Sequence, residues 1–197
     1  MALSKEYHYF VKKELNLIMR RTGAIMFGDF TLKSGQRSTY YLDVRKLLLD
    51  PQGLMLTSEA CASIFNTFEE ADVVAGVELG AEPLSSAILL TFAQKNVQPP
   101  VRGAVIRKKV KDHGTAKRVE GYIKPNDIVV IVEDVVTTGS STVEAIKAAW
   151  DEGLKVCGVI AVIDREQGGK KAIEDMGVEY YPLMKVADLN LTDNKEA

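Results

Sequence analysis

Cysteine, histidine and tryptophan are scarce in this chain of 197 residues, which holds two cysteines, two histidines and one tryptophan. No Cys-x-x-Cys pair occurs, so the ligand patterns of a structural zinc site are missing. Cys61 and Cys157 lie far apart, each within an apolar stretch. This setting favours two buried small hydrophobes over a disulfide or a metal-binding pair.

An excess of positive charge is also missing. Lysine and arginine number 25 against 27 acidic residues, giving a net charge of −2, whereas nucleic-acid-binding domains usually carry a basic surplus. No apolar run approaches the length of a membrane span, and the first residues lack the apolar segment of a signal peptide. We therefore expect a cytoplasmic protein that binds neither nucleic acid nor membrane.

The composition that is present, 46% hydrophobic and 26% charged, is typical of a soluble globular protein. Its length fits a single domain, 1–197. Apolar spacing predicts a helix over about 5–21, and short aromatic and β-branched stretches over 24–32 and 39–43 predict a small antiparallel flap. The helix and flap thus take up about residues 1–50, before a core over about 51–185.

In the core, apolar strands alternate with helices. Pro51 opens a helix that is expected to reach about Glu70. The pattern then predicts strands over 72–77, 103–107, 127–134, 155–163 and 178–182, and helices over 83–95, 140–152 and 170–176. Such alternation predicts an α/β fold with a central, mostly parallel sheet flanked by helices. Ligands bind beyond the carboxyl ends of such strands, where the loops 76–83 and 164–169 and the end of the strand 127–134 are expected to meet.

The most informative stretch is 128–142, in which an apolar strand ends in the paired acids Glu133 and Asp134 and a loop of hydroxyl residues and Gly139 leads into a helix. Backbone N–H groups and hydroxyls at a helix N-terminus suit a phosphate. The carboxylates suit sugar hydroxyls or a hydrated Mg²⁺. A Walker A loop would need a lysine here, and a dinucleotide fingerprint would need three glycines. An ordinary N-cap explains only one of the hydroxyls, so the stretch indicates a sugar-phosphate site.

After the stretch 128–142, the segment 107–121 says most about function. It contains six lysines or arginines, one histidine and two glycines. It lacks the apolar periodicity of a packed helix or strand. Most charge runs are solvated surface, but structureless loops of this length in compact domains are often functional. A mobile cationic lid over a small polyanion is the functional interpretation.

The stretch 132–141 resembles the phosphoribosyl pyrophosphate (PRPP) signature of the type I phosphoribosyltransferases, and three further segments narrow the resemblance to the orotate phosphoribosyltransferases. The resemblance implies the type I phosphoribosyltransferase fold with a small N-terminal hood or flap. It also implies a set of PRPP-binding residues in the signature, namely Glu133, Asp134, Val135, Val136, Thr137, Thr138, Gly139, Ser140 and Ser141.

The other three segments carry further roles. The segment 107–114 is similar to the family's mobile catalytic loop, usually shared between the subunits of a homodimer. By that match the catalytic residues are Arg107, Lys108, Lys111 and His113. The stretch 30–41, otherwise a plain hairpin, is similar to the flap motif whose lysine, here Lys33, reaches the substrate phosphates or base.

The segment 164–169 contains Arg165, which without a functional role would be an ordinary salt-bridged loop residue. Its planar fork matches a carboxylate, and the resemblance implies that Arg165 and Thr137 bind orotate. In one place the chain departs from many bacterial members: the loop 77–83 lacks their lysine, and Gly80 stands in its place.

The resemblance implies transfer of the phosphoribosyl group from PRPP to orotate, giving orotidine 5′-monophosphate and pyrophosphate in pyrimidine (UMP) biosynthesis. Mg²⁺ is the implied cofactor, carried mainly by the substrate pyrophosphate, and its protein ligands are left open. Two alternatives remain: a phosphoribosyltransferase for a purine or xanthine, and a non-catalytic regulatory module with the same fold.

Overall fold

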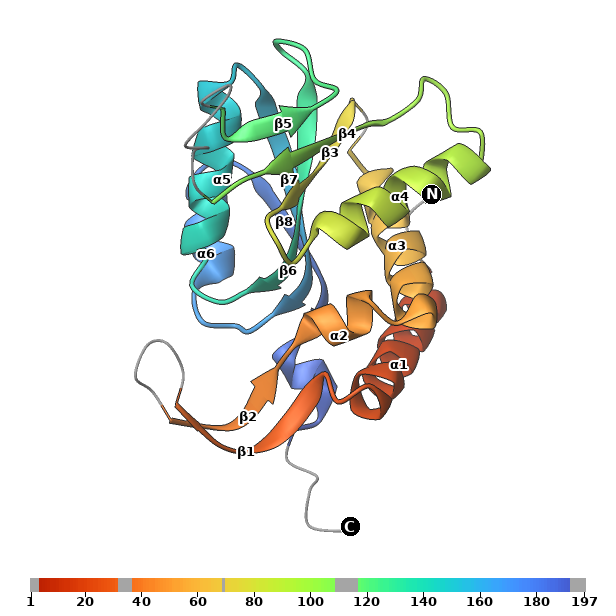
Figure 1. Cartoon of the computed structure of the whole chain (residues 1–197), viewed down its shortest axis with the longest axis vertical. Coiled ribbons are helices and arrows are strands. Elements are labelled where there is room, and N and C mark those ends of the chain that lie inside the picture. The colour runs from red at the N-terminus through yellow and green to blue at the C-terminus, as the bar shows by residue number, and fades with distance from the viewer. Residues whose placement is uncertain (1–3, 32–36, 69, 109–116, 192–197) are drawn as a thin grey trace.

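The computed structural model describes residues 4–31, 37–68, 70–108 and 117–191. Its centre is a six-stranded sheet in the order β5-β4-β3-β6-β7-β8, with helices on both faces (Figure 1). The strands are β3 (Val73–Val77), β4 (Arg102–Ile106), β5 (Val119–Gly121), β6 (Ile128–Val136), β7 (Lys155–Asp164) and β8 (Glu179–Lys185). All neighbours pair in parallel except β4 and β5, which are antiparallel. The predicted α/β class with a mostly parallel sheet is confirmed.

The helices form one layer on each face of the sheet. The described helices are α1 (Lys5–Arg21), α2 (Val44–Leu48), α3 (Pro51–Phe65), α4 (Glu82–Gln94), α5 (Ser140–Asp151), α6 (Gly169–Glu174) and the 3₁₀ turn η1 (Val186–Leu189). In Figure 1, α5 and α6 cover one face and α3 and α4 the other, with α1 packed on α3. Both faces of the central strands are therefore buried, which explains why β3 is apolar throughout.

The first helix follows directly from its sequence. The Ser4 hydroxyl accepts a hydrogen bond from the backbone N–H of Tyr7 at 3.1 Å and so caps the helix N-terminus. Arg20 and Arg21 lie in the last turn, where cations interact favourably with the helix dipole. Val11 and Leu15 lie on the buried face. The helix has the predicted bounds.

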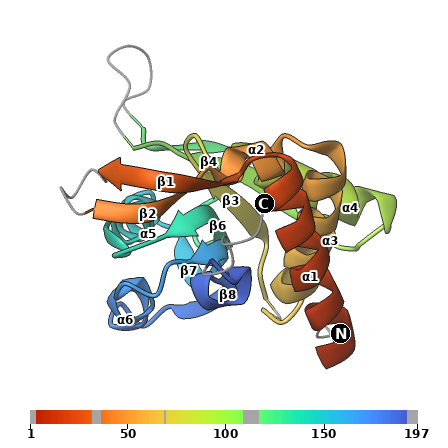
Figure 2. The ribbon, with the colours of Figure 1, turned by 90° about the horizontal axis from the view of Figure 1, so that it is seen from below.

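The predicted flap is an antiparallel hairpin of β1 (Ile25–Thr31) and β2 (Arg37–Leu42). The five-residue helix α2 follows it, and together we call β1, β2 and α2 the hood. Seen from below, the hood lies across the end of the core to which β6 and β7 run (Figure 2). The carboxyl ends of the parallel strands therefore face the hood.

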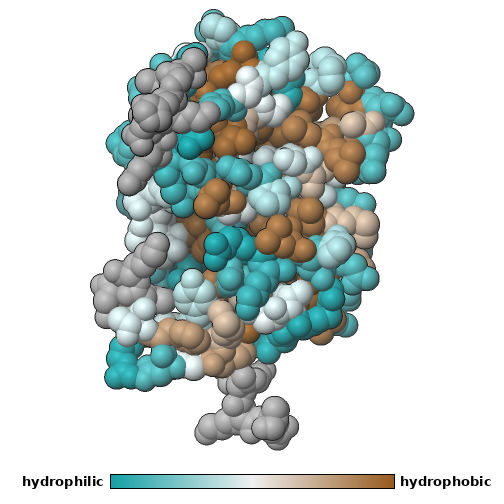
Figure 3. Space-filling view, viewed as in Figure 1, coloured by the Kyte–Doolittle hydropathy of each residue, from teal (hydrophilic) through white to brown (hydrophobic). Residues whose placement is uncertain are grey.

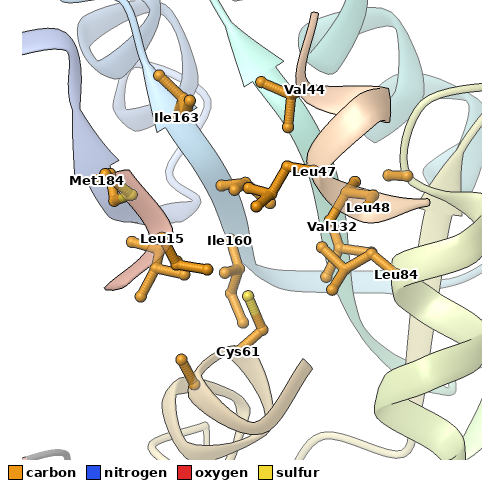
Figure 4. Packing of buried hydrophobic residues seen from close by; sticks show 14 of the residues in the cluster. Leu15, Val44, Leu47, Leu48, Cys61, Leu84, Val132, Ile160, Ile163 and Met184 are labelled. Atoms are coloured by element: carbon orange, nitrogen blue, oxygen red, sulfur yellow. The ribbon is translucent and has the colours of Figure 1, made fainter. Parts of the chain in front are cut away.

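Two apolar clusters hold these layers together, one on each face of the sheet. In the first, Leu47 of α2 packs near Leu15 of α1 and Ile160 of β7, and Cys61 of α3 points into the same layer (Figure 4). Leu47 and Cys61 are completely buried. The hood is thus anchored to the core through α2.

Some predicted boundaries were wrong. The helix that begins at Pro51 ends at Phe65 and does not reach Glu70. The segment 107–121, expected to be without regular structure, contains β5 at its end, because residues 119–121 pair with the edge of β4. The helix α2 and the turn η1 were not predicted. Within the described part of the chain, no helix combines the length and apolarity needed to cross a membrane.

Candidate active site

An open pocket of about 1360 Å³ lies between the hood and the carboxyl ends of the parallel strands. Its lining is drawn from the hood, from the turn that follows β3, and from the loops behind β4, β6 and β7. The core contributes Glu78, Leu79, Gly80, Lys108, Asp134, Val135, Thr137, Thr138, Gly139, Ser140, Ser141, Arg165 and Gln167. Loops far apart in the sequence meet here, as the order of the strands predicts.

The floor of the pocket is the turn between β6 and α5. Gly139 adopts φ +80°, a left-handed conformation that suits glycine, and the chain turns there into the helix. The hydroxyls of Thr138 and Ser140 lie 3.3 Å apart. The twelve-residue helix α5 begins at Ser140, so its free N–H groups and positive dipole end face the pocket. This turn is suited to hold a phosphate.

The paired acids of β6 point to different places. Asp134 lines the pocket, whereas Glu133 does not and is only 4% exposed. The Ser141 hydroxyl donates a hydrogen bond of 3.1 Å to Glu133 Oε1, which places Glu133 behind the phosphate-type turn. Successive side chains of a strand face opposite sides of the sheet, so the two adjacent acids point to opposite faces.

Burial raises the pKa of both carboxyl groups and makes them weaker acids than usual. Desolvation, together with repulsion from Asp134, raises the pKa of Glu133 to about 8. Desolvation also raises the pKa of Asp134, while the hydrogen bond from the Val135 N–H and the nearby positive charge of Lys108 lower it. Carboxyl groups with a raised pKa beside a pocket are typical of functional sites.

Arg165 and Thr137 are brought together by the packing of two loops. The Arg165 N–H donates to the Val136 carbonyl at 2.8 Å, and the Gly169 N–H donates to the Thr137 carbonyl at 3.0 Å. A Cβ atom on Gly169 would lie 2.3 Å from a methyl carbon of Val136, so this approach requires glycine. The loop behind β7 is therefore fixed to the end of β6, and both predicted base-binding residues line one pocket.

The predicted catalytic segment is described only at its two ends. Lys108 lines the pocket, and its backbone N–H donates to Glu78 at 3.2 Å. Arg107 does not line the pocket; its guanidinium lies 4.0 Å from Glu78 and 3.7 Å from Glu120. Lys111, His113 and Lys33 lie outside the described residues.

The hood supplies pocket residues that the sequence interpretation missed. They are Thr31, Tyr41, Leu42, Asp43, Val44 and Arg45. The Nε of Arg45 donates to Asp43 at 3.1 Å, and this bond, with a smaller contribution from Asp134, raises the pKa of Arg45. No motif marks these positions, because they reach the pocket only through the fold of the hairpin and α2.

Gly80 stands where many bacterial members of the resembled family have a lysine, and it lies against Asp134. A Cβ atom on Gly80 would be 2.0 Å from an Asp134 carboxylate oxygen. The carboxylate fills the space that a side chain would take. Beside it, Arg45 is near enough to Asp134 for each to affect the pKa of the other. A cation of the hood therefore lies close to the turn that lacks this lysine, in addition to Lys108 of the core.

Comparison with known proteins identifies the family of this chain. A model of the phosphoribosyl transferase domain matches residues 44–178, more than half of the chain. The chain therefore belongs to the phosphoribosyltransferase family.

The nearer relatives narrow the family further. The orotate phosphoribosyltransferase of Pyrococcus abyssi is 41% identical over 180 residues, covering 91% of this chain and 95% of that protein. That of Aquifex aeolicus is 41% identical over 160 residues, covering 81% and 86%. The crystal structure of the Mycobacterium tuberculosis enzyme in complex with PRPP has a TM-score of 0.73 at 32% identity, covering 92% and 99%. Within the family, the chain belongs with the orotate phosphoribosyltransferases, which confirms the resemblance found in the sequence.

Proposed function

We propose that this protein transfers the phosphoribosyl group of PRPP to orotate, giving orotidine 5′-monophosphate and pyrophosphate, as a step of pyrimidine biosynthesis. The ring nitrogen N1 of the orotate anion forms a bond to the ribose anomeric carbon. The bond from that carbon to the diphosphate oxygen breaks, and pyrophosphate leaves with the electron pair. The observation that carries the proposal is one pocket that joins the turn 137–141, Asp134 and Arg165.

In this proposal the turn holds the 5′-phosphate and so orients the ribose. Thr138, Gly139, Ser140 and Ser141 surround that group at the N-terminus of α5. Asp134 accepts hydrogen bonds from ribose hydroxyls, and Glu133 supports the same end of the site from behind by holding Ser141. Positive charge that develops on the ribose ring in the transition state is favoured beside the carboxylate of Asp134.

Orotate is the acceptor because Arg165 offers a planar pair of donors to a carboxylate. Thr137 lies next to it in the pocket and contacts the ring. A purine or xanthine carries no such carboxylate, and Arg165 would have no partner in their transfer. The proposed specificity is therefore for a carboxylated pyrimidine.

Magnesium enters the proposal together with PRPP. Among residues 4–31, 37–68, 70–108 and 117–191, no three histidine, cysteine or acidic side chains come together as a metal site. Asp134 is a pocket carboxylate that suits a hydrated ion held mainly by the substrate. When bound there, Mg²⁺ neutralises charge on the leaving diphosphate. We also propose a cytoplasmic location, which cell fractionation combined with the activity assay tests.

We further propose a homodimer in which the segment 107–121 of one subunit completes the site of the other. Exposed apolar side chains on the side of α2, α3 and α4 support a second copy as the partner; Leu49, Met55 and Leu90 are 71%, 58% and 60% exposed. Apolar patches lie over α2 and α4 among polar residues (Figure 3). In this arrangement Lys108 lines the pocket of its own subunit, and Arg107, Lys111 and His113 add positive charge that stabilises the departing diphosphate.

The direct test is to mix the purified protein with orotate, PRPP and Mg²⁺ and to follow the loss of orotate absorbance. The same assay with adenine, guanine, hypoxanthine and xanthine separates the proposal from its nearest alternative. Orotate-dependent release of pyrophosphate is the expected result. Transfer to a purine, or binding of PRPP without transfer to any base, would overturn it.

The catalytic segment is tested by Lys111→Ala. The variant is expected to lose about 3 kcal/mol of transition-state stabilisation, or roughly 10²-fold in turnover, the scale of a lost oxyanion donor. Lys109→Ala is the matched control, because it removes a neighbouring cation that is not among the proposed catalytic residues. Turnover equal to that of the unmodified protein would contradict the assignment of Lys111.

The shared segment is tested by co-expressing Lys111→Ala with Asp134→Asn. The activity of mixed dimers shows whether each segment serves the neighbouring subunit or its own. Sharing leaves one intact site in a mixed dimer, made of the segment of the Asp134→Asn subunit and the core of the other, so part of the activity returns. Without sharing, both sites of the mixed dimer keep one defect and the activity stays lost.

A further inference from the structure

Arg165 is held from the hood side by an aromatic ring. Its guanidinium carbon lies 5.5 Å from the ring centroid of Tyr40, within the range of a cation–π contact. Tyr40 belongs to β2 and Arg165 to the loop behind β7, so the contact crosses from hood to core. It joins the two walls of the pocket at the residue that is proposed to recognise the acceptor.

The other interactions of Arg165 leave its donors free. Its backbone N–H is fixed to Val136, but its Nε is buried and has no hydrogen-bond partner within the described residues. In the same part of the chain no carboxylate forms an ion pair with it, although the neighbouring Glu166 is 3.8 Å from Lys185. A buried guanidinium donor without a partner is costly unless a ligand satisfies it.

A ring face can hold a guanidinium without using its N–H donors, because the attraction is to the π-electron face. A protein carboxylate in the same place would occupy the donors and compete with a substrate carboxylate. The ring therefore restricts the position of Arg165 while its planar fork stays available. Orientation gained in this way reduces the side-chain entropy that binding would otherwise remove.

Tyr40 is itself held in place by its strand. It pairs with Phe27 across the hairpin, its N–H donates to the Ser38 hydroxyl at 3.3 Å, and its carbonyl accepts from the same hydroxyl at 2.7 Å. The side chain is half-buried and does not line the pocket. It is thus placed to act on Arg165 and not on a ligand.

We propose that Tyr40 is a positioning residue for acceptor recognition, which holds the guanidinium of Arg165 by its ring face so that the donors of Arg165 meet the acceptor carboxylate. The inference rests on the proposed function, since it assumes that the acceptor carries a carboxylate. It adds that the hood takes part in base selection through a residue that does not touch the base.

The test compares Tyr40→Leu with Tyr40→Phe in the orotate assay. Removing the ring is expected to raise the KM for orotate about 5-fold to 10-fold, the range of a partly desolvated cation–π contact. The KM for PRPP and kcat are expected to stay within about 2-fold, and Tyr40→Phe, which keeps the ring, is expected to behave as the unmodified protein. Phe27→Leu is the matched control, because it alters the partner of Tyr40 in the hairpin without removing the ring over Arg165.

A double-mutant cycle with Arg165→Ala separates positioning from a general loss of structure. If Tyr40 acts through Arg165, the change at Tyr40 has no further effect on the KM for orotate once Arg165 is removed. An equal effect in both backgrounds, an unchanged KM for orotate in Tyr40→Leu, or a Tyr40→Phe variant as impaired as Tyr40→Leu would each overturn the proposal. Tyr40→Gln, a polar replacement without a ring, serves the same comparison if Tyr40→Leu does not fold.

The unmodified protein distinguishes failure of this inference from failure of the proposed function. If it transfers phosphoribosyl to orotate and Tyr40→Leu leaves the KM for orotate unchanged, the function stands and the positioning role falls. If the unmodified protein does not use orotate, the function and the inference that rests on it fall together.

Discussion

The two walls of the pocket are built differently. The core wall is formed by the ends of β6 and β7 and the turns behind them, and backbone hydrogen bonds from Arg165 to Val136 and from Gly169 to Thr137 fix these turns to each other. The hood wall is a two-stranded hairpin with a register shift between Phe27 and Phe30. A hairpin of two strands is marginally stable alone. The core wall therefore carries its own geometry, whereas the hood depends on α2 and on contacts such as that between Tyr40 and Arg165.

The difference suggests a division of labour between the walls. In the proposed function, Asp134 and the turn 137–141 hold the phosphoribosyl group and lie on the core wall. Arg45 and Tyr40 lie on the hood and act on the fit of the substrates. Changes on the core wall should then reduce catalysis itself. Changes on the hood should mainly raise a KM. The first two of the following variants test that contrast, and the third tests the buried acid behind the core wall.

The largest effect is expected on the core wall from Asp134→Asn. The change removes a negative charge that lines the pocket and a strong acceptor for ribose hydroxyls. The kcat/KM for PRPP should fall roughly 10-fold to 100-fold, the range of a lost hydrogen bond to a charged group, with a reduced kcat. Steady-state kinetics at saturating orotate measures it. A variant with normal kcat and only a raised KM would remove the contrast between the walls.

A smaller effect is expected on the hood from Arg45→Gln. Arg45 is a hood cation that lines the pocket beside Asp134, at the turn where Gly80 stands in place of a lysine. If it attracts the diphosphate, the KM for PRPP should rise roughly 10-fold while the KM for orotate and kcat stay near normal. Lys46→Gln is the matched control, because Lys46 bonds to the Gly23 carbonyl and does not line the pocket. Equal effects of the two variants would show that only the net charge of α2 matters.

The smallest effect is expected behind the core wall, from Glu133→Gln. The pKa of Glu133 is raised from 4.5 to about 8, so the folded protein keeps a proton that the unfolded chain has already released. The free energy of unfolding should therefore fall as pH rises through this window, by at most about 1.4 kcal/mol per pH unit.

Glutamine keeps the shape of the protonated acid and does not titrate. Between pH 6 and 7 the melting temperature of Glu133→Gln should fall roughly 3–5 °C less than that of the unmodified protein. Calorimetry in the absence of substrates measures it. Parallel melting curves across this pH range would mean that Glu133 is ionised in the folded protein, and its place would then belong with the charged groups of the wall.

The core wall could be predicted from the sequence because its signals are local. The apolar run before Glu133, the hydroxyls after it and Gly139 are adjacent in the chain, and the order of the strands brings Arg165 beside them. The different directions of Glu133 and Asp134 were missed, although the two-residue period of a strand separates adjacent side chains. The alternation of side chains along a strand was enough to predict that these two carboxylates point to opposite faces of the sheet.

The hood wall could not be predicted in the same way. The helix α2 has only five residues, too few for an apolar period to stand out. Arg45 reaches the pocket because Leu47 and Leu48 of α2 are buried against the core, and Tyr40 reaches Arg165 across two walls that are distant in sequence. The strand β5 was missed for a related reason, since three residues gain a strand conformation only by pairing with β4. Placement by tertiary contact leaves no local pattern.

The outer strands of the central sheet bear on how copies of this protein can meet. At one border β5 has three residues, and at the other β8 contains Pro182, which has no N–H to donate. Short edge strands and proline in an edge strand hinder the addition of a further strand to a sheet. Neither border is a template for a continuous intermolecular sheet, so stable contact between copies is left to side chains on helices and loops. The same feature lowers the tendency of the folded chain to polymerise through its strands.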